Sequence, residues 1–284
     1  MRILITGSNG FIGKHLIAML SKSGHDIIMV DLQNDIDITK WEDVENITKC
    51  EIVYHLAAKS YVPDSFQNPE SFYYTNIIGT LNILKYCRIN NSKLVFLSSY
   101  VYGTPEYLPV NEDHPIKSLN PYSQSKIICE NICEAYNRDF NVPVAIIRPF
   151  NIYGFGQRPE FLIPKLITQF KSENKEVVID NTITKRDFIH IHDVCSALVG
   201  FLKCEYSLDV FNLSSGQSIS IKDIIQILHQ LTGERKFIQD LNTVREGEVF
   251  ETIGDNSKLM RKLSWRPVIT FHEGITDLYK VYEA

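Results

Sequence analysis

The feature that most constrains this chain is a set of three glycines that follows a short apolar stretch near the N-terminus. Residues 3–6 read Ile-Leu-Ile-Thr, and Gly7, Gly10 and Gly13 come next, with two residues between each pair. An apolar run that stops at a glycine and continues as an amphipathic pattern predicts a strand, a tight turn and a helix. The free N–H groups and the positive dipole end of such a helix favour a pyrophosphate.

The three glycines have different expected roles. Gly7 can adopt the positive φ that the turn requires, and Gly10, which has no Cβ, lets the backbone come close to a bound cofactor. Gly13 lets the helix lie against the strand, and Phe11 and Ile12 complete the predicted cofactor-binding loop. The first interval is one residue longer than in the standard dinucleotide fingerprint. An ordinary strand-to-helix turn therefore stays open as an alternative at this point.

The second predicted strand, residues 26–30, is followed by Asp31. A carboxylate at this point binds the ribose hydroxyls of a dinucleotide. The turn after it has no Arg or Lys that could bind a ribose 2′-phosphate, so the sequence favours NAD(H), with NADP(H) as the second choice. The segment 35–38 reads as a short third strand that places Asp37 and Ile38 near the adenine.

Composition excludes several classes of function. The chain has 284 residues, 44% of them hydrophobic, which is enough for one large core or for a nucleotide domain with a smaller partner. A net charge of −5 without a basic run argues against nucleic acid and anionic membrane surfaces as partners. No apolar run approaches the ~20 residues of a spanning helix, and the chain enters its first predicted strand without a signal peptide. The six cysteines lack Cys-x-x-Cys spacing, so we expect reduced packing residues, no bound metal and a cytoplasmic location.

Strand-like and helix-like patterns alternate through the first half of the chain. After the second strand, the expected strands cover residues 51–56, 94–97 and 142–147, and the expected helices cover residues 69–87 and a segment that begins near Asn120. Such alternation predicts an α/β fold with a Rossmann-like, doubly wound parallel sheet.

Beyond about residue 150 the elements become shorter and less regular. Strand-like segments at 177–179, 188–191 and 210–213 alternate with helical ones at 164–170, 193–202, 221–231 and 271–282. We therefore expect a dinucleotide-binding domain over residues 1–150 and a smaller C-terminal α/β substrate-binding part over residues 151–284. The order of the elements also predicts that the two parts exchange some of them.

Two predicted strands end in residues that suit a bound ligand. Leu56 is followed by Ala57 and Ala58, whose small side chains suit a flat cofactor that lies over the sheet edge. Close packing accounts for these residues equally well. Ser98 follows the strand at 94–97, and its hydroxyl can hydrogen-bond a substrate oxygen that alternates between carbonyl and alcohol. Capping of the strand end is the other role open to it.

Tyr122 and Lys126 are four residues apart on one predicted helix, so they share a face. A phenol with a pKa near 10 is a poor base at neutral pH. A neighbouring ammonium favours the phenolate and lowers that pKa, and the remaining donors of the lysine can hold ribose hydroxyls. A surface tyrosine and a solvated lysine would give the same spacing by chance.

Together these motifs resemble the extended short-chain dehydrogenase/reductases of the nucleotide-sugar class, which comprises 4-epimerases, 4,6-dehydratases and 4-ketoreductases. The matching stretches run over essentially the whole chain: Gly7-x-x-Gly10-Phe11-Ile12-Gly13, His55-Leu56-Ala57-Ala58, Asn76-Ile77-Ile78-Gly79-Thr80, Ser98-Ser99, Tyr122-x-x-x-Lys126, Arg148-Pro149-Phe150-Asn151-Ile152-Tyr153-Gly154, Arg186-Asp187-Phe188, Arg245-Glu246-Gly247-Glu248 and Asp255-Asn256-Ser257-Lys258.

The resemblance implies roles for individual residues. The implied catalytic set is Ser98, Tyr122 and Lys126, with Ser99 as the less favoured serine. Lys59 and Asn76 join the cofactor-binding residues already named, together with Tyr122 and Lys126. The implied substrate-binding residues are Ser60, Tyr61, Ser99, Asn151, Arg186 and Arg245. The two arginines suit a sugar-nucleotide pyrophosphate because guanidinium forks match phosphate oxygens.

Within the class, the sequence argues against a dehydratase. That reaction needs an additional acid and base, which the family supplies close after the catalytic serine or threonine, and here Ser99 and Tyr100 stand there. Local resemblances, among them Lys59–Ser65 and Gly154–Pro159, favour an NAD(P)H-dependent 4-ketoreductase of a nucleotide-linked 4-keto-6-deoxyhexose. The alternative is an NAD-dependent 4-epimerase of the UDP-glucose type. A non-catalytic dinucleotide sensor ranks third, since it could dispense with the Tyr–Lys pair.

The implied partners are a dTDP-, GDP- or UDP-linked hexose and a second copy of the chain. Relatives pair through two long helices, one of which includes residues 122–138 here. Apolar residues on this helix could equally face the core of their own chain.

Overall fold

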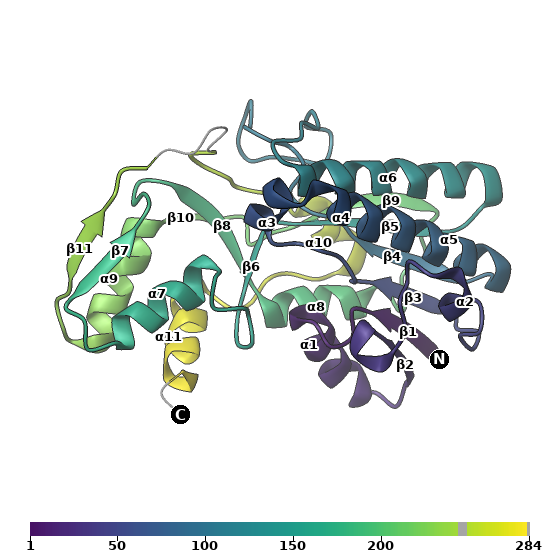
Figure 1. Cartoon of the computed structure of the whole chain (residues 1–284), viewed down its shortest axis with the longest axis horizontal. Coiled ribbons are helices and arrows are strands. Elements are labelled where there is room, and N and C mark those ends of the chain that lie inside the picture. Colours follow the sequence, from purple (N-terminus) through teal and green to yellow (C-terminus); the bar gives the residue numbers. More distant parts are fainter. Residues whose placement is uncertain (244–248, 283–284) are drawn as a thin grey trace.

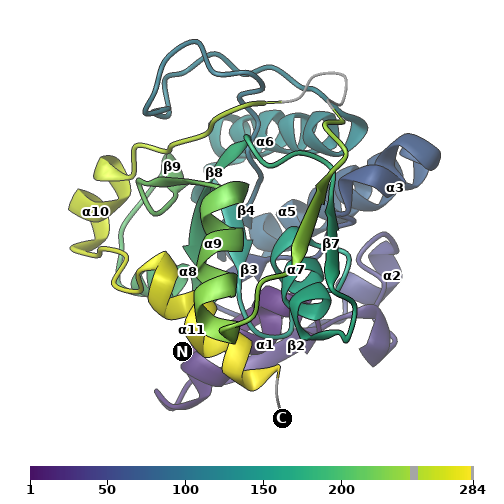
Figure 2. The same cartoon turned by 90° about the vertical axis from the view of Figure 1, so that its left-hand side faces the viewer.

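The structure is a computed structural model that describes residues 1–243 and 249–282. A larger part built on one sheet contains the N-terminus, and a smaller part lies beside it (Figure 1). Figure 2 looks at the smaller part from the front, where α7, α9 and α11 are seen together.

The larger part is built on a six-stranded sheet in the order β2-β1-β3-β4-β5-β9. All five strand pairs are parallel. The strands are β1 (Arg2–Thr6), β2 (Asp26–Val30), β3 (Ile52–His55), β4 (Lys93–Leu97), β5 (Val144–Pro149) and β9 (Leu208–Leu213). The strand order reverses at β1, and ligands of open α/β sheets bind at the carboxyl ends of the strands beside such a reversal. The predicted Rossmann-like fold is confirmed.

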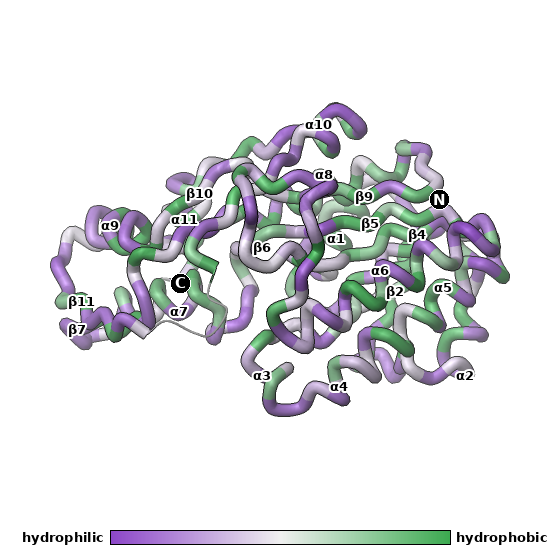
Figure 3. Tube along the Cα trace, turned by 90° about the horizontal axis from the view of Figure 1, so that it is seen from above, coloured by the Kyte–Doolittle hydropathy of each residue, from purple (hydrophilic) through white to green (hydrophobic). Residues whose placement is uncertain are grey.

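Helices cover both faces of this sheet. The helices α1 (Phe11–Ser21) and α8 (Ile191–Gly200) lie on one face, and α2 (Trp41–Val44), α5 (Gly79–Asn90) and α6 (Pro121–Phe140) lie on the other. Successive side chains of β1 alternate between the two cores, since Ile3 and Ile5 pack with α1 and α8 while Leu4 packs with α5 and α6. Strands buried on both faces have long apolar runs, such as residues 94–97 of β4 and 144–147 of β5, where the trace is mostly green (Figure 3).

The predicted short strand at residues 35–38 is wrong. The chain instead makes a 3₁₀ turn at Leu32–Asn34. The carboxylate of Asp31 accepts a hydrogen bond from the N–H of Gln33, and that of Asp37 accepts one from the N–H of Thr39. Such local bonds compete with strand pairing.

The helix expected over residues 69–87 is interrupted. It begins as α4 (Pro69–Tyr73), passes through a π-helical turn at Tyr74–Ile78 and continues as α5 to Asn90. Asn76 is the buried residue of this turn. Single π turns within helices are frequent at functional sites.

The smaller part combines two small sheets with three helices. Its strands are β6 (Asn151–Tyr153), β8 (Lys185–His190) and β10 (Ser218–Ser220) in one sheet, and β7 (Glu176–Ile179) and β11 (Phe237–Asp240) in the other. The helices α7 (Leu162–Lys171), α9 (Ile221–Thr232) and α11 (Phe271–Val281) share its core, and α10 (Ser257–Leu263) contributes to the core of the larger part. Because β9 and α8 also belong to the larger part, the chain crosses between the two parts more than once.

His55, at the end of β3, predicts a pH-dependent stability. Its Nδ1 lies 2.7 Å from Thr6 Oγ1 and its Nε2 lies 3.1 Å from Thr80 Oγ1. Burial, aided by the charge of Lys126, lowers the pKa of His55 from 6.5 to about 3. Between these values the unfolded chain binds one more proton than the folded chain, so stability falls as the pH falls, by about 1.4 kcal/mol per pH unit at most.

The measurement is the free energy of unfolding in urea at several pH values from neutral down to mildly acidic. We expect His55→Gln to be less stable at neutral pH and to lose stability less steeply on acidification than the parent. Parallel pH curves for the two proteins would contradict this assignment.

Candidate active site

The glycine turn after β1 is shaped for close approach of a ligand. Gly7 has a φ of +69°, and a Cβ placed on it would lie 2.8 Å from the backbone nitrogen of Ala57. A Cβ on Gly13 would lie 2.3 Å from Gly7 O, so the helix and the turn pack without room for a side chain. A Cβ on Gly10 would meet only Gly7 O, at 3.1 Å. Only glycine fits at positions 7 and 13, where protein backbone lies too close for a Cβ. The space beside Gly10 is open, as a pyrophosphate at the start of α1 requires.

Asp31 lies at the carboxyl end of β2, next to this turn. Its Oδ2 accepts a hydrogen bond from the N–H of Asn9 at 3.1 Å, and its Oδ1 accepts one from the N–H of Gln33 at 3.1 Å. The side-chain Nδ2 of Asn9 donates to Asn34 Oδ1 at 2.7 Å. The carboxylate is therefore held in place where a ribose next to the pyrophosphate would lie. Asp37 is engaged with Thr39, and Ile38 is buried against Gly79.

The segment after β3 is held by Asn76. Its Oδ1 accepts from the N–H of Lys59 at 2.9 Å, and its Nδ2 donates to Lys59 O at 3.1 Å and to Ser125 Oγ at 2.8 Å. The N–H of Ala57 donates to Thr6 Oγ1 at 3.2 Å. Asn76 thus joins the strand end to α6. Both polar atoms of the Asn76 side chain are bonded to protein groups, so Asn76 stabilises the segment at the carboxyl end of β3.

Tyr122 and Lys126 lie in the first two turns of α6. The side chain of Asn120 caps this helix by accepting from the N–H of Ser123 at 2.8 Å. Lys126 is buried, and its Nζ donates to Leu97 O at 2.7 Å. An ammonium has three N–H donors, so two remain for ribose hydroxyls. Burial lowers the pKa of Lys126.

The two serines after β4 face different partners. Ser98 is 2% exposed, and its Oγ donates to Glu130 Oε1 at 2.5 Å. Burial raises the pKa of Tyr122, and the nearby hydroxyl of Ser99 opposes that rise. Because Glu130 holds the hydroxyl of Ser98, Ser99 becomes the better candidate for the substrate oxygen. Which of the two serines is catalytic stays a prediction.

The expected effect of Lys126 on the phenol stays a prediction. In the structure its ammonium donates to the carbonyl of Leu97. The lysine holds the end of β4 in this arrangement.

The substrate side is formed by β6, β8 and two loops. Asn151 lies on β6, next to β8, and its Nδ2 donates to Asp187 O at 3.3 Å. The positive charge of Arg186 acts on the neighbouring phenol of Tyr100 and lowers its pKa, against the larger rise caused by burial.

Tyr61, in the segment after β3, contacts the loop between β6 and α7. Its ring lies 5.6 Å from that of Phe161, and the Arg158 guanidinium lies 5.3 Å from the Tyr61 ring. Ser60, beside it, is exposed. Arg245 lies outside the described residues. The sequence analysis assigned no individual role to Arg158, because its contact with the Tyr61 ring depends on tertiary structure.

The comparisons with known proteins identify the family. The sequence pattern of the NAD dependent epimerase/dehydratase family matches residues 3–213. The chain belongs to this family. Because members use NAD(P), this family member is an NAD(P)-dependent enzyme, and the fit of the glycine turn agrees.

The chain is similar to three relatives over nearly its whole length. It is 34% identical to GDP-6-deoxy-D-talose 4-dehydrogenase of Aggregatibacter actinomycetemcomitans, over 93% of this chain and 91% of that protein. It is 32% identical to a putative UDP-glucose 4-epimerase of Methanocaldococcus jannaschii, over 96% and 95%. The solved structure of RMD from Pseudomonas aeruginosa complexed with NADPH superposes with a TM-score of 0.92 at 27% identity, over 99% and 98%.

The described part of the chain contains neither a cluster of metal-binding side chains nor a membrane-spanning helix. In residues 1–243 and 249–282, no group of three or more His, Cys, Asp or Glu side chains could hold a metal ion. Over the same residues, no helix is long and apolar enough to cross a membrane.

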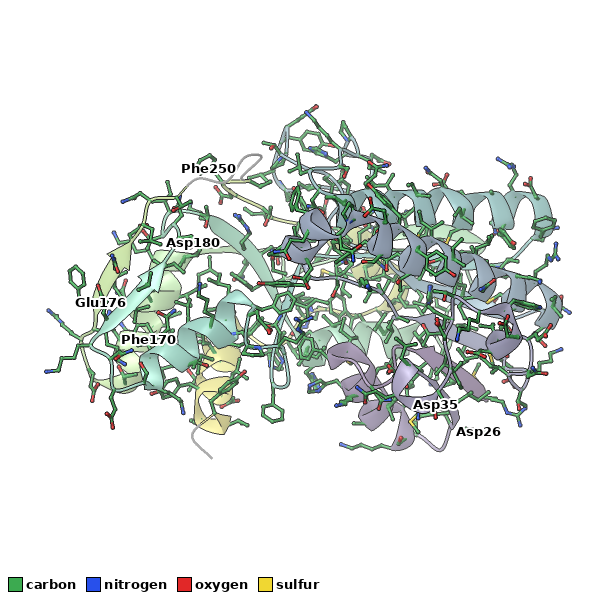
Figure 4. All side chains as sticks on the ribbon, viewed as in Figure 1. Asp26, Asp35, Phe170, Glu176, Asp180 and Phe250 are labelled. Atoms are coloured by element: carbon green, nitrogen blue, oxygen red, sulfur yellow. The ribbon has the colours of Figure 1, made fainter. Side chains whose placement is uncertain are left out.

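Asp31 predicts the cofactor preference of this family member. A negative carboxylate at the ribose repels a 2′-phosphate, so Asp31→Ser should lower the ratio of kcat/KM with NADH to that with NADPH by about tenfold, equivalent to about 1.4 kcal/mol. The control is Asp26→Asn, because Asp26 is exposed at the other end of β2, beside Arg2 (Figure 4). An unchanged ratio in Asp31→Ser, or an equal change in both variants, would contradict the prediction.

Proposed function

We propose that this chain is a reductase that transfers a hydride to C4 of a nucleotide-linked 4-keto-6-deoxyhexose. The observation that carries the proposal is the buried Lys126, one turn after Tyr122 on α6, whose Nζ donates to the carbonyl of Leu97 at the carboxyl edge of the sheet. The 34% identity to GDP-6-deoxy-D-talose 4-dehydrogenase supports chemistry at this carbon, and it makes a GDP-linked sugar the first substrate to test.

The residues present can carry out the proton chemistry. Bound NAD(P)H supplies the hydride that adds to C4 of the sugar. Tyr122 gives its phenolic proton to O4 as the ketone becomes an alcohol, and Ser99 hydrogen-bonds the same oxygen. The positive charge of Lys126 stabilises the phenolate that this leaves on Tyr122. Its two remaining N–H donors hold the ribose.

We assign the substrate-binding residues by the charge of their side chains and by their position in the structure. Arg186 would bind the sugar diphosphate, because a guanidinium matches phosphate oxygens in a bidentate manner. Asn151, on the strand beside it, would contact the same group. Ser60 and Tyr61 would line the sugar pocket, and Arg245 remains a predicted diphosphate ligand.

Dehydration is a poor fit to the same site. Removal of water needs an additional acid and base close after the catalytic serine, and positions 99, 100 and 101 hold Ser, Tyr and Val, none of them a carboxylate. The phenol of Tyr100 donates to Gly103 O at 2.8 Å, and its ring packs 5.2 Å from that of Phe150. This tyrosine is committed to the local fold, and burial raises its pKa.

A 4-epimerase is the second candidate. The same Ser99, Tyr122 and Lys126 would first remove the hydride from C4 and then return it to the other face of the sugar. The 32% identity to a putative UDP-glucose 4-epimerase favours it. The homodimer, the cytoplasmic location and the boundary at residue 150 remain predictions.

The test is a turnover assay in which each cofactor is supplied separately. The purified protein is incubated with UDP-, dTDP- and GDP-linked hexoses and with their 4-keto-6-deoxy forms, each with NADH, with NADPH or with neither. Loss of reduced nicotinamide in proportion to a 4-keto-6-deoxy sugar supports the reductase and identifies its nucleotide. Interconversion of two C4 epimers without net cofactor consumption supports the epimerase instead.

A further inference from the structure

Residues 154–161 form the loop between β6 and α7, and we call this loop the strap. It begins after Tyr153 and ends before Leu162, two residues that belong to the core of the smaller part. Phe155 and Arg158 within it are exposed. The strap nevertheless contacts the larger part at two separate points, and the proposed reaction gives it no role.

The first contact is with α1. His15 Nε2 lies 2.7 Å from Phe155 O, and since a carbonyl oxygen only accepts, Nε2 carries the proton in this bond. The His15 ring also packs edge-on against the ring of Phe11, with 5.6 Å between the ring centroids. Because His15 comes two residues after Gly13, this contact attaches the strap beside the glycine turn.

The second contact is with Tyr61, in the segment after β3. The Phe161 ring lies 5.6 Å from the Tyr61 ring in an edge-on arrangement, and the Arg158 guanidinium lies 5.3 Å from the same ring. Tyr61 comes four residues after Ala57, whose backbone nitrogen lies 2.8 Å from the position of a Cβ on Gly7. The strap therefore contacts both chain segments that meet at the glycine turn.

The strap also has room to move. Gly156 has a φ of +84°, and a Cβ placed on it would meet nothing within 4 Å. Beside the bond between His15 and Phe155 lies a cavity of about 310 Å³, lined by both residues and by side chains of α1, α8 and α11. A few loop residues with free space around them are sufficient for a hinge. The strap can therefore shift without opening a packed core.

We propose that the strap retains the bound cofactor, and that its detachment from His15 and Tyr61 sets the rate at which the cofactor leaves. The two contacts join the strap to the segments that form the dinucleotide site, so a bound cofactor and an attached strap stabilise each other. Such coupling is reciprocal, since a strap that slows loss of the cofactor is itself held in place by the cofactor. This inference rests on cofactor binding at the glycine turn and is independent of which sugar reaction follows.

Two variants loosen the strap, one at each contact. His15→Phe removes the bond to Phe155 O and keeps a ring beside Phe11, and Arg158→Met removes the cation from the Tyr61 ring. The measurement is dissociation of NADH after excess NAD⁺ is added, followed by nicotinamide fluorescence in a stopped-flow instrument. We expect each variant to release NADH about 3–10-fold faster than the parent, the effect expected from loss of one hydrogen bond or cation–π contact.

The matched control is His229→Phe on α9, which belongs to the smaller part and lies far from α1 (Figure 1). His229 Nδ1 lies 3.0 Å from Glu234 O, and its ring packs edge-on at 5.0 Å from that of Phe170. The substitution thus removes the same kind of bond, and NADH release should equal that of the parent. Unchanged release from His15→Phe and Arg158→Met would overturn the proposal, as would equal acceleration in the control.

Proteolysis by chymotrypsin, which cleaves after aromatic residues, provides a second readout. Phe155 is 55% exposed in the strap, and Phe237 is 67% exposed on β11 and serves as the internal control. Because cleavage follows the population of the open form, saturating NADH should slow cleavage after Phe155 about threefold or more in the parent and less in His15→Phe. Cleavage after Phe237 should be the same with and without NADH.

The fragment masses identify each cleavage site. Equal cleavage after Phe155 with and without NADH in the parent would overturn the proposal, and so would equal protection of both sites. Neither measurement uses a sugar, so an inactive parent in the turnover assay would count against the proposed function and not against the role of the strap.

Discussion

Replacing Tyr122 with phenylalanine should lower kcat by about 10²–10⁴-fold, the range that a positioned general acid or base contributes. The phenol is the proposed proton donor to O4, one turn before Lys126 on α6. Its ring would still pack 6.4 Å from that of Phe72 in the variant. Affinity for the cofactor and the folded structure should therefore change little. The measurement is single-turnover oxidation of reduced nicotinamide, because it reports hydride transfer without product release.

The matched control is Tyr136→Phe, on the same helix. Tyr136 packs 5.1 Å from the ring of Phe140, near the C-terminal end of α6. This variant should retain the parent rate. A Tyr122→Phe protein that reduced the ketone at the parent rate would remove Tyr122 from the mechanism.

Replacing Arg148 with methionine should cost about 3–5 kcal/mol of unfolding free energy, because it leaves the buried carboxylate of Glu130 without its cation. The partners are 4% and 3% exposed and share three hydrogen bonds between 2.6 and 3.2 Å. The loss would be measured by chemical denaturation at neutral pH. Removal of both charges in Arg148→Met with Glu130→Met should recover much of the loss, since an apolar pair of similar volume carries no unpaired charge.

The control for this prediction is Arg138→Met on the same helix. Arg138 pairs with Asp139 at 2.7 Å, but the two side chains are 73% and 45% exposed. Solvent screens such a pair, so its loss should not change stability measurably. Equal destabilisation by Arg148→Met and Arg138→Met would contradict the role given to burial.

The parts of the fold that depend on short-range pattern could be predicted from the sequence. The glycine turn at residues 7–13 and the position of Asp31 follow from one strand, one turn and one helix start, and the structure places them together. The parallel sheet followed from repeated alternation of strand and helix patterns. The strand expected at 35–38 failed because Asp31 and Asp37 make local turns that an apolar alternation does not reveal.

The parts that depend on tertiary contacts could not be predicted. Ser98 and Ser99 are adjacent residues of the same type, so the sequence alone does not show which of them is bonded to Glu130, 32 residues away from Ser98. The π turn at Asn76 depends on bonds to Lys59 and Ser125, which lie on other elements. Arg148 belonged to a recognised motif, but its pairing with Glu130 required the approach of β5 to α6.

The most direct test of the proposed reduction at C4 follows the transferred hydrogen. The protein is incubated with a GDP-linked 4-keto-6-deoxyhexose and NADH that carries deuterium at the transferred position of the nicotinamide, and the sugar nucleotide is analysed by mass spectrometry. We expect one deuterium at C4 of each product molecule and oxidation of one NADH for each. Interconversion of C4 epimers without deuterium gain and without loss of NADH would contradict this expectation and would assign the site to an epimerase.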